Sequence, residues 1–174
     1  MKKIKAVQIG IGHDHATAAI GSLRKLTQFF DIAGYVAPAV EVEKYGGRRK
    51  SFANLPELTL EQVLADDSIE AVVIETEEVS LTDTALACAR AGKHIQMDKP
   101  GGLDPDAYEE MLRVMKRKEL VFHTGYMYRY NAEVMRVIEM VKNGEFGEIF
   151  RSRPIWTAAI PPKSANGWKP SRAA

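Results

Sequence analysis

Two glycines one residue apart, Gly10 and Gly12, lead directly into a His-Asp-His run near the start of the chain. The glycines end an apolar run rich in β-branched residues, and a helical pattern follows over residues 16–26. A strand, a glycine turn and a helix in that order present a nucleotide pyrophosphate to a helix N-terminus. His15 stands in place of the third glycine of this fingerprint, so the turn alone indicates a dinucleotide site without proving it.

Metal binding is the other chemistry that this turn could support, because His13 and His15 flank Asp14. Histidines so close in the sequence rarely converge on one ion, and no further ligands are nearby. We therefore predict no metal site. We expect residues 10–15 to line the entrance for a pyrophosphate and a nicotinamide, with His15 capping the following helix or packing under it.

Lys99 is the residue best placed for catalysis. It follows a strand predicted at residues 94–97, and ligands bind at the carboxyl ends of strands in open α/β folds. We expect the preceding Asp98 to orient Lys99 or its loop rather than to take a proton itself. Taken alone, a Lys-Pro pair is more often an ordinary exposed lysine, so the interpretation of Lys99 depends on its surroundings.

The elements that would position these residues alternate between strand and helix. Thr59 and Gln62 have the spacing of a capping box, and Asp104 followed by Pro105 is a typical helix start. The alternation predicts an α/β fold, a doubly wound, mostly parallel, Rossmann-like sheet with helices on both faces. Strands are predicted at 4–9, 32–37, 69–74, 94–97 and 120–124, and helices at 16–26, 40–45, 60–65, 80–91, 105–117 and 131–142.

The pattern changes after Gly147. Residues 148–160 alternate in places, which predicts a strand of a different, more exposed sheet, and residues 161–167 resemble a linker. A lone strand after a completed α/β domain has no partner. We expect a dinucleotide-binding domain at 1–125, and at 126–174 a connecting helix and the first strand of an incomplete α+β domain that was begun and cut off.

Composition limits the classes of function. The chain has 174 residues, 45% of them hydrophobic and 27% charged, as in a soluble globular protein. A net charge of +1 argues against nucleic acid as a partner. The sequence contains no run of about 18 apolar residues, so no membrane-spanning segment is predicted. The single cysteine, Cys88, lies on an apolar helical pattern, which predicts a buried and inert thiol, and we expect a cytoplasmic protein.

Several motifs together make the chain resemble the N-terminal half of the Gfo/Idh/MocA family of NAD(P)-dependent sugar and polyol oxidoreductases. The combination of Gly-Lys-His, a hydrophobic strand and acid-Lys-Pro is far more specific than the glycines alone. The resemblance spans essentially the whole chain and rests on Gly10 and Gly12, on 69–74, on Ala91-Gly92-Lys93-His94-Ile95, on Asp98-Lys99-Pro100, on Gly125-Tyr126-Met127-Tyr128-Arg129 and on Gly144-Glu145-Phe146-Gly147-Glu148-Ile149.

The resemblance implies a cofactor, NAD or NADP, and a small sugar-like or polyol substrate. It places Lys99 beside the nicotinamide and the substrate hydroxyl, where a cation stabilises the alkoxide that develops as hydride leaves carbon. It also implies a cis bond before Pro100. The cofactor-binding residues that it implies are Gly10, Ile11, Gly12, His13, Asp14, His15, Thr76, Asp98, Lys99, Pro100 and Arg129.

The chain departs from the family pattern at the ribose. Ala37 stands where the family has an acid at the end of the second strand, so Glu41 or Glu43 would have to reach back from the next helix. Arg48 and Arg49 could instead meet a 2′-phosphate. After the third strand Thr76 is kept, but glutamates replace the usual Pro-Asn, and we expect the side chains of Glu75, Glu77 and Glu78 to point to solvent.

The family's proton-transfer histidine belongs to the second domain, and nothing of that kind occurs before Ala174. We therefore expect this chain to be inactive or impaired as an enzyme. Two alternatives stay open: a non-catalytic dinucleotide-binding module or remnant, and a structural protein that pairs through its final strand. Homo-oligomerisation is open as well.

Overall fold

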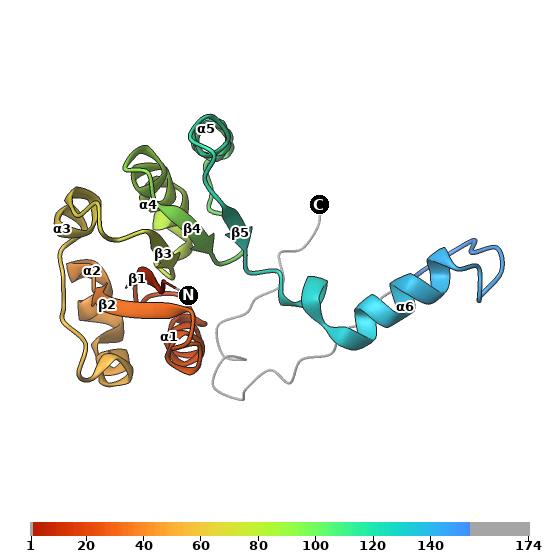
Figure 1. The fold of residues 1–174 in the computed structure, drawn as a ribbon, viewed down its shortest axis with the longest axis horizontal. Coiled ribbons are helices and arrows are strands. Elements are labelled where there is room, and N and C mark those ends of the chain that lie inside the picture. The colour runs from red at the N-terminus through yellow and green to blue at the C-terminus, as the bar shows by residue number, and fades with distance from the viewer. Residues whose placement is uncertain (1, 154–174) are drawn as a thin grey trace, which may run out of the picture. The chain divides into compact units, whose positions relative to one another are not determined.

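A five-stranded parallel sheet organises the first of two compact units in the computed structural model, which describes residues 2–153 (Figure 1). This unit ends at Met127, and the second unit begins at Tyr128. All strand pairs are parallel, and the predicted doubly wound sheet is confirmed. The strand order is β2-β1-β3-β4-β5, with β1 (Ile4–Ile9), β2 (Phe30–Val36), β3 (Ala71–Ile74), β4 (His94–Met97) and β5 (Phe122–Thr124).

The helices begin where the sequence supplies a cap. The Thr59 side chain accepts from the Gln62 N–H while the Gln62 side chain accepts from the Thr59 N–H, so the predicted capping box is confirmed. Asp104 accepts two N–H bonds at the start of α5, with Pro105 in the first turn. The helices are α1 (Ala16–Lys25), α2 (Ala39–Tyr45), α3 (Leu60–Ala65), α4 (Glu78–Arg90), α5 (Pro105–Arg117) and α6 (Ala132–Lys142), with 3-10 helices η1 (Gly46–Phe52) and η2 (Met127–Tyr130).

Helices cover both faces of the sheet. Because successive residues of a strand point to opposite faces, one strand contributes side chains to the cores on both sides. Val72 and Ile74 of β3 pack with α4 and α5 in one cluster, while Val73 packs with α1 and η1 in the other (Figure 1). Cys88 of α4 lies fully buried in the first cluster, and this burial raises the pKa of its thiol to about 12. The prediction of a buried Cys88 is confirmed.

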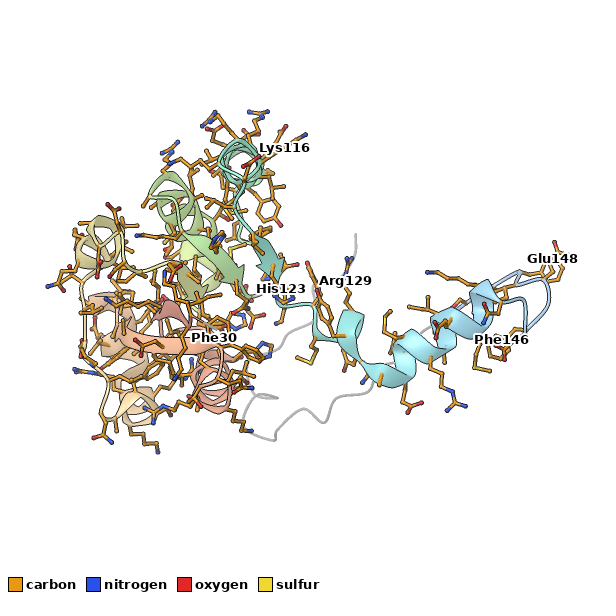
Figure 2. All side chains as sticks on the ribbon, viewed as in Figure 1. Phe30, Lys116, His123, Arg129, Phe146 and Glu148 are labelled. Carbon is orange, nitrogen blue, oxygen red and sulfur yellow. The ribbon has the colours of Figure 1, made fainter. Side chains whose placement is uncertain are left out.

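The second unit contains α6, which begins after the Asn131 cap and ends at Lys142, before the C-cap Asn143, close to the predicted bounds 131–142. Apolar side chains along α6 are exposed, Val137 by 51% and Met135 by 47%. Figure 2 draws the side chains of this helix and labels Phe146 beyond its end. Residues 148–153 form no strand, and the rest of the strand predicted up to Ile160 lies outside the described residues. No helix in the described part is long and apolar enough to cross a membrane.

Candidate functional site

The glycine turn, residues 10–15, joins β1 to α1 at the carboxyl edge of the sheet. Gly10 has a φ of +97°, and a Cβ at this position would overlap the backbone of Thr76. The His13 N–H donates to the Glu75 carbonyl oxygen at 2.9 Å, which holds the turn against the end of β3. Glycine is required at position 10 both by the backbone conformation and by the close approach of two chain segments.

The carboxylate of Glu41 is buried in this turn, with 3% of the residue exposed. Its Oε2 accepts the N–H groups of Ile11 at 2.7 Å and Gly12 at 2.8 Å, and its Oε1 accepts the Glu77 N–H at 2.8 Å. Consecutive N–H groups that converge in this way form an anion-binding nest. No acid stands at Ala37, and Glu41 reaches back from the first turn of α2 to the amides of the glycine turn. Its expected contact with a ribose stays a prediction.

Arg48 of η1 binds the carbonyl oxygens of the same turn, whereas Glu41 binds its N–H groups. Its Nη1 donates to the carbonyl oxygens of Ile11, Gly12 and His13 at 2.7–3.0 Å, and its Nη2 donates to Asp14 Oδ1 at 3.0 Å. Arg49 pairs with Glu57. Both guanidinium groups that could have met a 2′-phosphate therefore bind acceptors within this chain.

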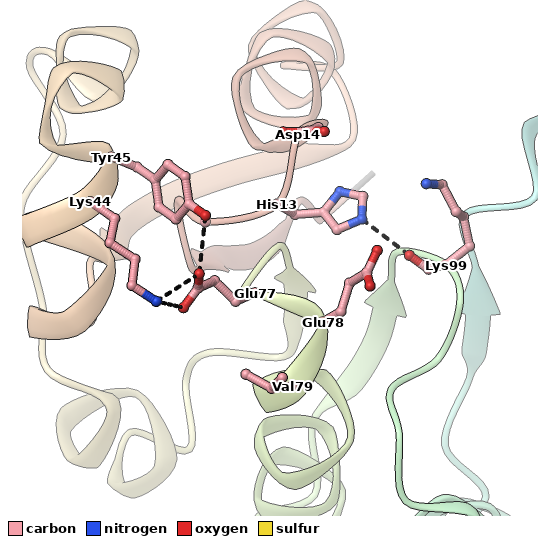
Figure 3. A pocket seen from close by; sticks show the side chains of 9 residues that line it. His13, Asp14, Lys44, Tyr45, Glu77, Glu78, Val79 and Lys99 are labelled. Atoms are coloured by element: carbon pink, nitrogen blue, oxygen red, sulfur yellow. Dashed lines mark hydrogen bonds and ion pairs between the residues drawn. The ribbon is translucent and has the colours of Figure 1, made fainter. Parts of the chain in front are cut away.

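A cleft of about 390 Å³ opens beside the glycine turn (Figure 3). On one wall Glu77 accepts from Lys44 Nζ at 2.9 Å and from the Tyr45 hydroxyl at 3.0 Å. These bonds lower the pKa of Glu77 and raise those of Lys44 and Tyr45. Lys99 lies on the opposite wall. The cleft is lined by Gly12, His13, Asp14, Lys44, Tyr45, Glu77, Glu78, Val79 and Lys99.

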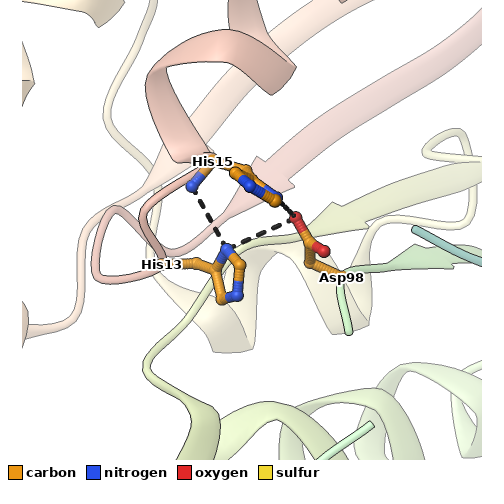
Figure 4. A group of neighbouring side chains, drawn as sticks. All are labelled: His13, His15 and Asp98. Atoms are coloured by element: carbon orange, nitrogen blue, oxygen red, sulfur yellow. Dashed lines mark hydrogen bonds and ion pairs between the residues drawn. The ribbon is translucent and has the colours of Figure 1, made fainter. Parts of the chain in front are cut away.

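Asp98 holds the end of β4 to the glycine turn (Figure 4). Its Oδ2 lies 2.6 Å from His15 Nδ1 and 3.3 Å from His13 Nδ1, and its Oδ1 accepts the Lys99 N–H at 2.6 Å. The last contact is the one expected of a residue that orients the Lys99 loop. The peptide bond between Lys99 and Pro100 is cis, as the resemblance implied. The sequence had suggested no further ligand near the two histidines, and this is wrong, because Asp98 reaches both rings.

Glu75 follows β3 and is 1% exposed, so the prediction that its side chain points to solvent is wrong. Its backbone pairs with Ile9 and His13, and this pairing turns the side chain inward beneath the glycine turn. Burial and the neighbouring Asp98 charge raise the pKa of Glu75 to about 8. Its Oε2 lies 3.5 Å from His13 Nδ1 and has no hydrogen-bond partner among the described residues. Glu77 is also half-buried against that prediction, whereas Glu78 is exposed as expected.

Thr76 lines a second cleft, of about 610 Å³, at the carboxyl ends of β1 and β2. The residue is buried, and its hydroxyl has no hydrogen-bond partner within residues 2–153. Thr76 and Glu77 are adjacent in the chain and line the two clefts, so both clefts open at the same edge of the sheet.

The structure thus brings together most of the predicted site residues. Residues 10–15, Thr76, Asp98 and Lys99 meet at one edge, while Pro100 lines a separate small cleft with Tyr108. Arg129 belongs to the second unit, so its role stays a prediction. Sequence reasoning missed that Arg48 binds the turn and that Glu75 is buried. The one signal for Glu41 was an acid in the first turn of the helix after β2.

Comparison with known proteins gives consistent results. Residues 4–126 match the model of an oxidoreductase family with an NAD-binding Rossmann fold. A myo-inositol 2-dehydrogenase of Thermotoga maritima is 25% identical over 87 residues, which cover 50% of this chain and 26% of that protein. An inositol 2-dehydrogenase of Rhizobium meliloti is 31% identical over 91 residues, 52% of this chain and 28% of that protein.

Solved structures agree with the fold. A scyllo-inositol dehydrogenase of Lactobacillus casei, crystallised with NAD(H) and scyllo-inositol, superposes with a TM-score of 0.70 at 22% identity. The superposition covers 84% of this chain and 43% of that chain. The chain therefore spans less than half the length of the relatives it matches.

Proposed function

The chain belongs to the Gfo/Idh/MocA oxidoreductase family, and from this premise we propose that its first unit binds a nicotinamide dinucleotide at the carboxyl edge of the sheet. The reaction that we propose for the whole protein is hydride transfer between the nicotinamide and a sugar-like or polyol alcohol. The glycine turn carries the proposal, because Gly10 allows its close approach to Thr76 and its amides already hold an anionic group.

The residues at this edge fit a dinucleotide in shape. Two clefts of about 390 and 610 Å³ lie on either side of the Thr76–Glu77 step. The buried Thr76 hydroxyl has no hydrogen-bond partner within residues 2–153, and we infer that a ligand in the larger cleft, near the carboxyl end of β2, supplies one. An adenosine in that cleft and a nicotinamide beside Lys99 would follow the general rule for ligands of open α/β sheets.

The charges favour NAD over NADP. Glu41 Oε1 accepts one bond from the Glu77 N–H and keeps a second acceptor position for a ribose hydroxyl. A 2′-phosphate at the same place would meet the buried carboxylate of Glu41. The two arginines that could offset this repulsion are bound to the turn and to Glu57. We therefore infer a preference for NAD(H).

Lys99 is the residue that we propose to act on the substrate. Its backbone is held at both ends, by Asp98 at the N–H and by His13 at the carbonyl oxygen. Its ammonium group borders the cleft, where it would polarise the substrate oxygen and stabilise a developing alkoxide (Figure 3). A bound nicotinamide supplies the hydride chemistry. Homo-oligomerisation and a cytoplasmic location stay predictions.

Fluorescence titration of the full chain with NADH and NADPH tests the proposal. We expect saturation with NADH at millimolar concentrations or below and weaker binding of NADPH. Thr76→Val should weaken NADH binding roughly five-fold, the effect of about one hydrogen bond. Thr17→Val, on the exposed face of α1, is the matched control and should bind NADH like the wild type. Absence of saturation with either dinucleotide would contradict the proposal.

A non-catalytic binding module is the second candidate. It is favoured by Glu41, whose carboxylate satisfies the turn without any ligand. Mixing the chain with NAD and scyllo-inositol distinguishes the two functions. Growth of NADH absorbance that Lys99→Met abolishes supports catalysis, whereas binding of NADH without turnover supports the module.

A further inference from the structure

We propose that His13, His15 and Asp98, with Glu75 as a fourth ligand, form a binding site for a divalent transition-metal ion such as Zn²⁺. His13 and His15 come from the glycine turn after β1 and Asp98 from the end of β4 (Figure 4). Glu75 comes from the end of β3 and lies 3.5 Å from His13. The inference goes beyond the function proposed above, although His13, His15 and Asp98 are also among the residues expected to bind the cofactor.

The hydrogen bonds of His13 determine which nitrogen is free to bind a metal ion. The His15 N–H points at His13 Nδ1 at 3.2 Å, so Nδ1 carries the lone pair. Nε2 then carries the proton and donates it to the Lys99 carbonyl oxygen at 3.1 Å. A metal-binding histidine is commonly oriented in just this way, by donating its other ring N–H to a backbone carbonyl.

The lone pair of His13 Nδ1 faces two carboxylates. Asp98 Oδ2 lies 3.3 Å away and Glu75 Oε2 lies 3.5 Å away. Three electron-rich atoms thus converge, and a shared proton or a bound cation at their centre relieves the repulsion between them.

Glu75 supplies an independent observation. The residue is 1% exposed, and Oε2 is one of the few buried side-chain atoms without a hydrogen-bond partner in residues 2–153. A carboxylate oxygen that is buried without a partner has a high desolvation cost. Coordination of a cation would satisfy it.

The spacing suits a small ion. The ligand atoms of His13, His15 and Asp98 all lie within 4.8 Å of one another. Tetrahedral Zn²⁺, with bonds of about 2.0–2.2 Å, places its ligand atoms roughly 3.3–3.5 Å apart. The distances from His13 to Asp98 and to Glu75 already match this value.

One distance has to change. His15 Nδ1 and Asp98 Oδ2 are 2.6 Å apart, closer than two ligands of one ion. The His15 side chain is 35% exposed, so its ring can move outward, and the weak contact from its own N–H to His13 would be given up. Two imidazoles with two carboxylates suit Zn²⁺ better than Mg²⁺ or Ca²⁺, which prefer oxygen ligands alone.

Titration calorimetry of the chelator-treated full chain with ZnCl₂ tests the site, and Co²⁺ absorption in the visible reports its geometry. We expect binding of one Zn²⁺ per chain and tetrahedral Co²⁺ bands. His15→Ala and Glu75→Gln should each weaken the affinity by at least roughly 10-fold. Asp14→Asn is the matched control, since this carboxylate is in the same turn but 91% exposed and paired with Arg48.

Circular dichroism of each variant verifies folding before titration. His15 is partly exposed and Glu75→Gln is isosteric, so both variants should fold. No Zn²⁺ binding by the wild type would overturn the proposal and leave the cluster holding only a shared proton. Equal affinity in the wild type, His15→Ala and Glu75→Gln would also overturn it, because the ion would then lie elsewhere. The NADH titration is a separate measurement, so failure of the metal site can be distinguished from failure of the proposed function.

Discussion

The charged side chains are buried at one edge of the parallel sheet and exposed at the other. At the carboxyl edge the carboxylates of Glu41, Glu75 and Asp98 are almost fully buried and face backbone amides or imidazoles. At the amino edge Lys2 pairs with Glu70, and their side chains are 83% and 35% exposed. Lys5 likewise pairs with Asp66 near the surface.

This difference distinguishes charged groups that water solvates from charged groups that the surrounding structure must hold in place. Exposed ion pairs contribute little to stability because water and salt screen them. A buried carboxylate is tolerated only when donors or cations surround it. The carboxyl edge therefore contains groups whose positions the surrounding structure must hold, and the same edge carries the glycine turn and Lys99. Four changes test the contrast.

Removing the Glu41 carboxylate should have the largest effect. Glu41→Ala leaves the N–H groups of Ile11, Gly12 and Glu77 without their acceptor, and each unsatisfied buried donor costs about 1–3 kcal/mol. Partial entry of water offsets some of this cost, so we expect a loss of about 3 kcal/mol in the free energy of unfolding, measured with urea. Glu43→Ala, exposed on the same helix, is the control and should unfold like the wild type. Equal losses in the two variants would contradict the contrast.

Replacing the Arg48 guanidinium should have the next largest effect. A lysine cannot reproduce the fork that binds three carbonyl oxygens and Asp14 together, so we expect Arg48→Lys to lose about 1–2 kcal/mol. Arg49→Lys alters the neighbouring, more exposed pair with Glu57 and serves as the control. If the unfolding midpoint falls as far for Arg49→Lys, the turn does not depend on Arg48 in particular.

The elements of the fold could be predicted because their signals are local. The capping box at Thr59, the Asp104–Pro105 start and the β-branched run before Glu75 each lie within a few residues of the structure they specify. The predicted and observed strand boundaries differ by one or two residues at β2, β3 and β5 and agree at β1 and β4. The helix predicted at 40–45 does end at Tyr45, but the chain continues as η1. This continuation brings Arg48 to the turn.

The contacts of the site could be predicted only in part. The place of the glycine turn and of Lys99 followed from motifs at strand ends. The burial of Glu75 could not follow, because a glutamate in a sequence is expected to be solvated, and its inward direction depends on pairing with residues far away along the chain. For the same reason Asp98 was not foreseen as the partner of two histidines 83 and 85 positions earlier.

Breaking the Lys2–Glu70 pair should have almost no effect. The Lys2 ammonium is 83% exposed, and its 3.2 Å contact with Glu70 is screened by solvent. We expect Lys2→Met to leave the urea midpoint within experimental error of the wild type, at both low and high salt. A loss comparable to that of Glu41→Ala would mean that the amino edge is not simply solvated.

The smallest change concerns the titration of Asp66 at the amino edge. Hydrogen bonds from the Ser68 hydroxyl and N–H lower the pKa of this carboxyl, and the charge of Lys5 has a smaller effect. A carboxyl whose pKa is lowered by folding stabilises the protein above its ordinary pKa, and this contribution is lost as the pH falls through the folded value. Ser68→Ala removes the hydroxyl, so the pKa of Asp66, followed by NMR titration, should rise toward its ordinary value. Lys5→Met is the matched comparison and should raise this pKa less. The reverse order would show that charge rather than local hydrogen bonding controls the amino edge, and the contrast with the carboxyl edge would then be one of degree.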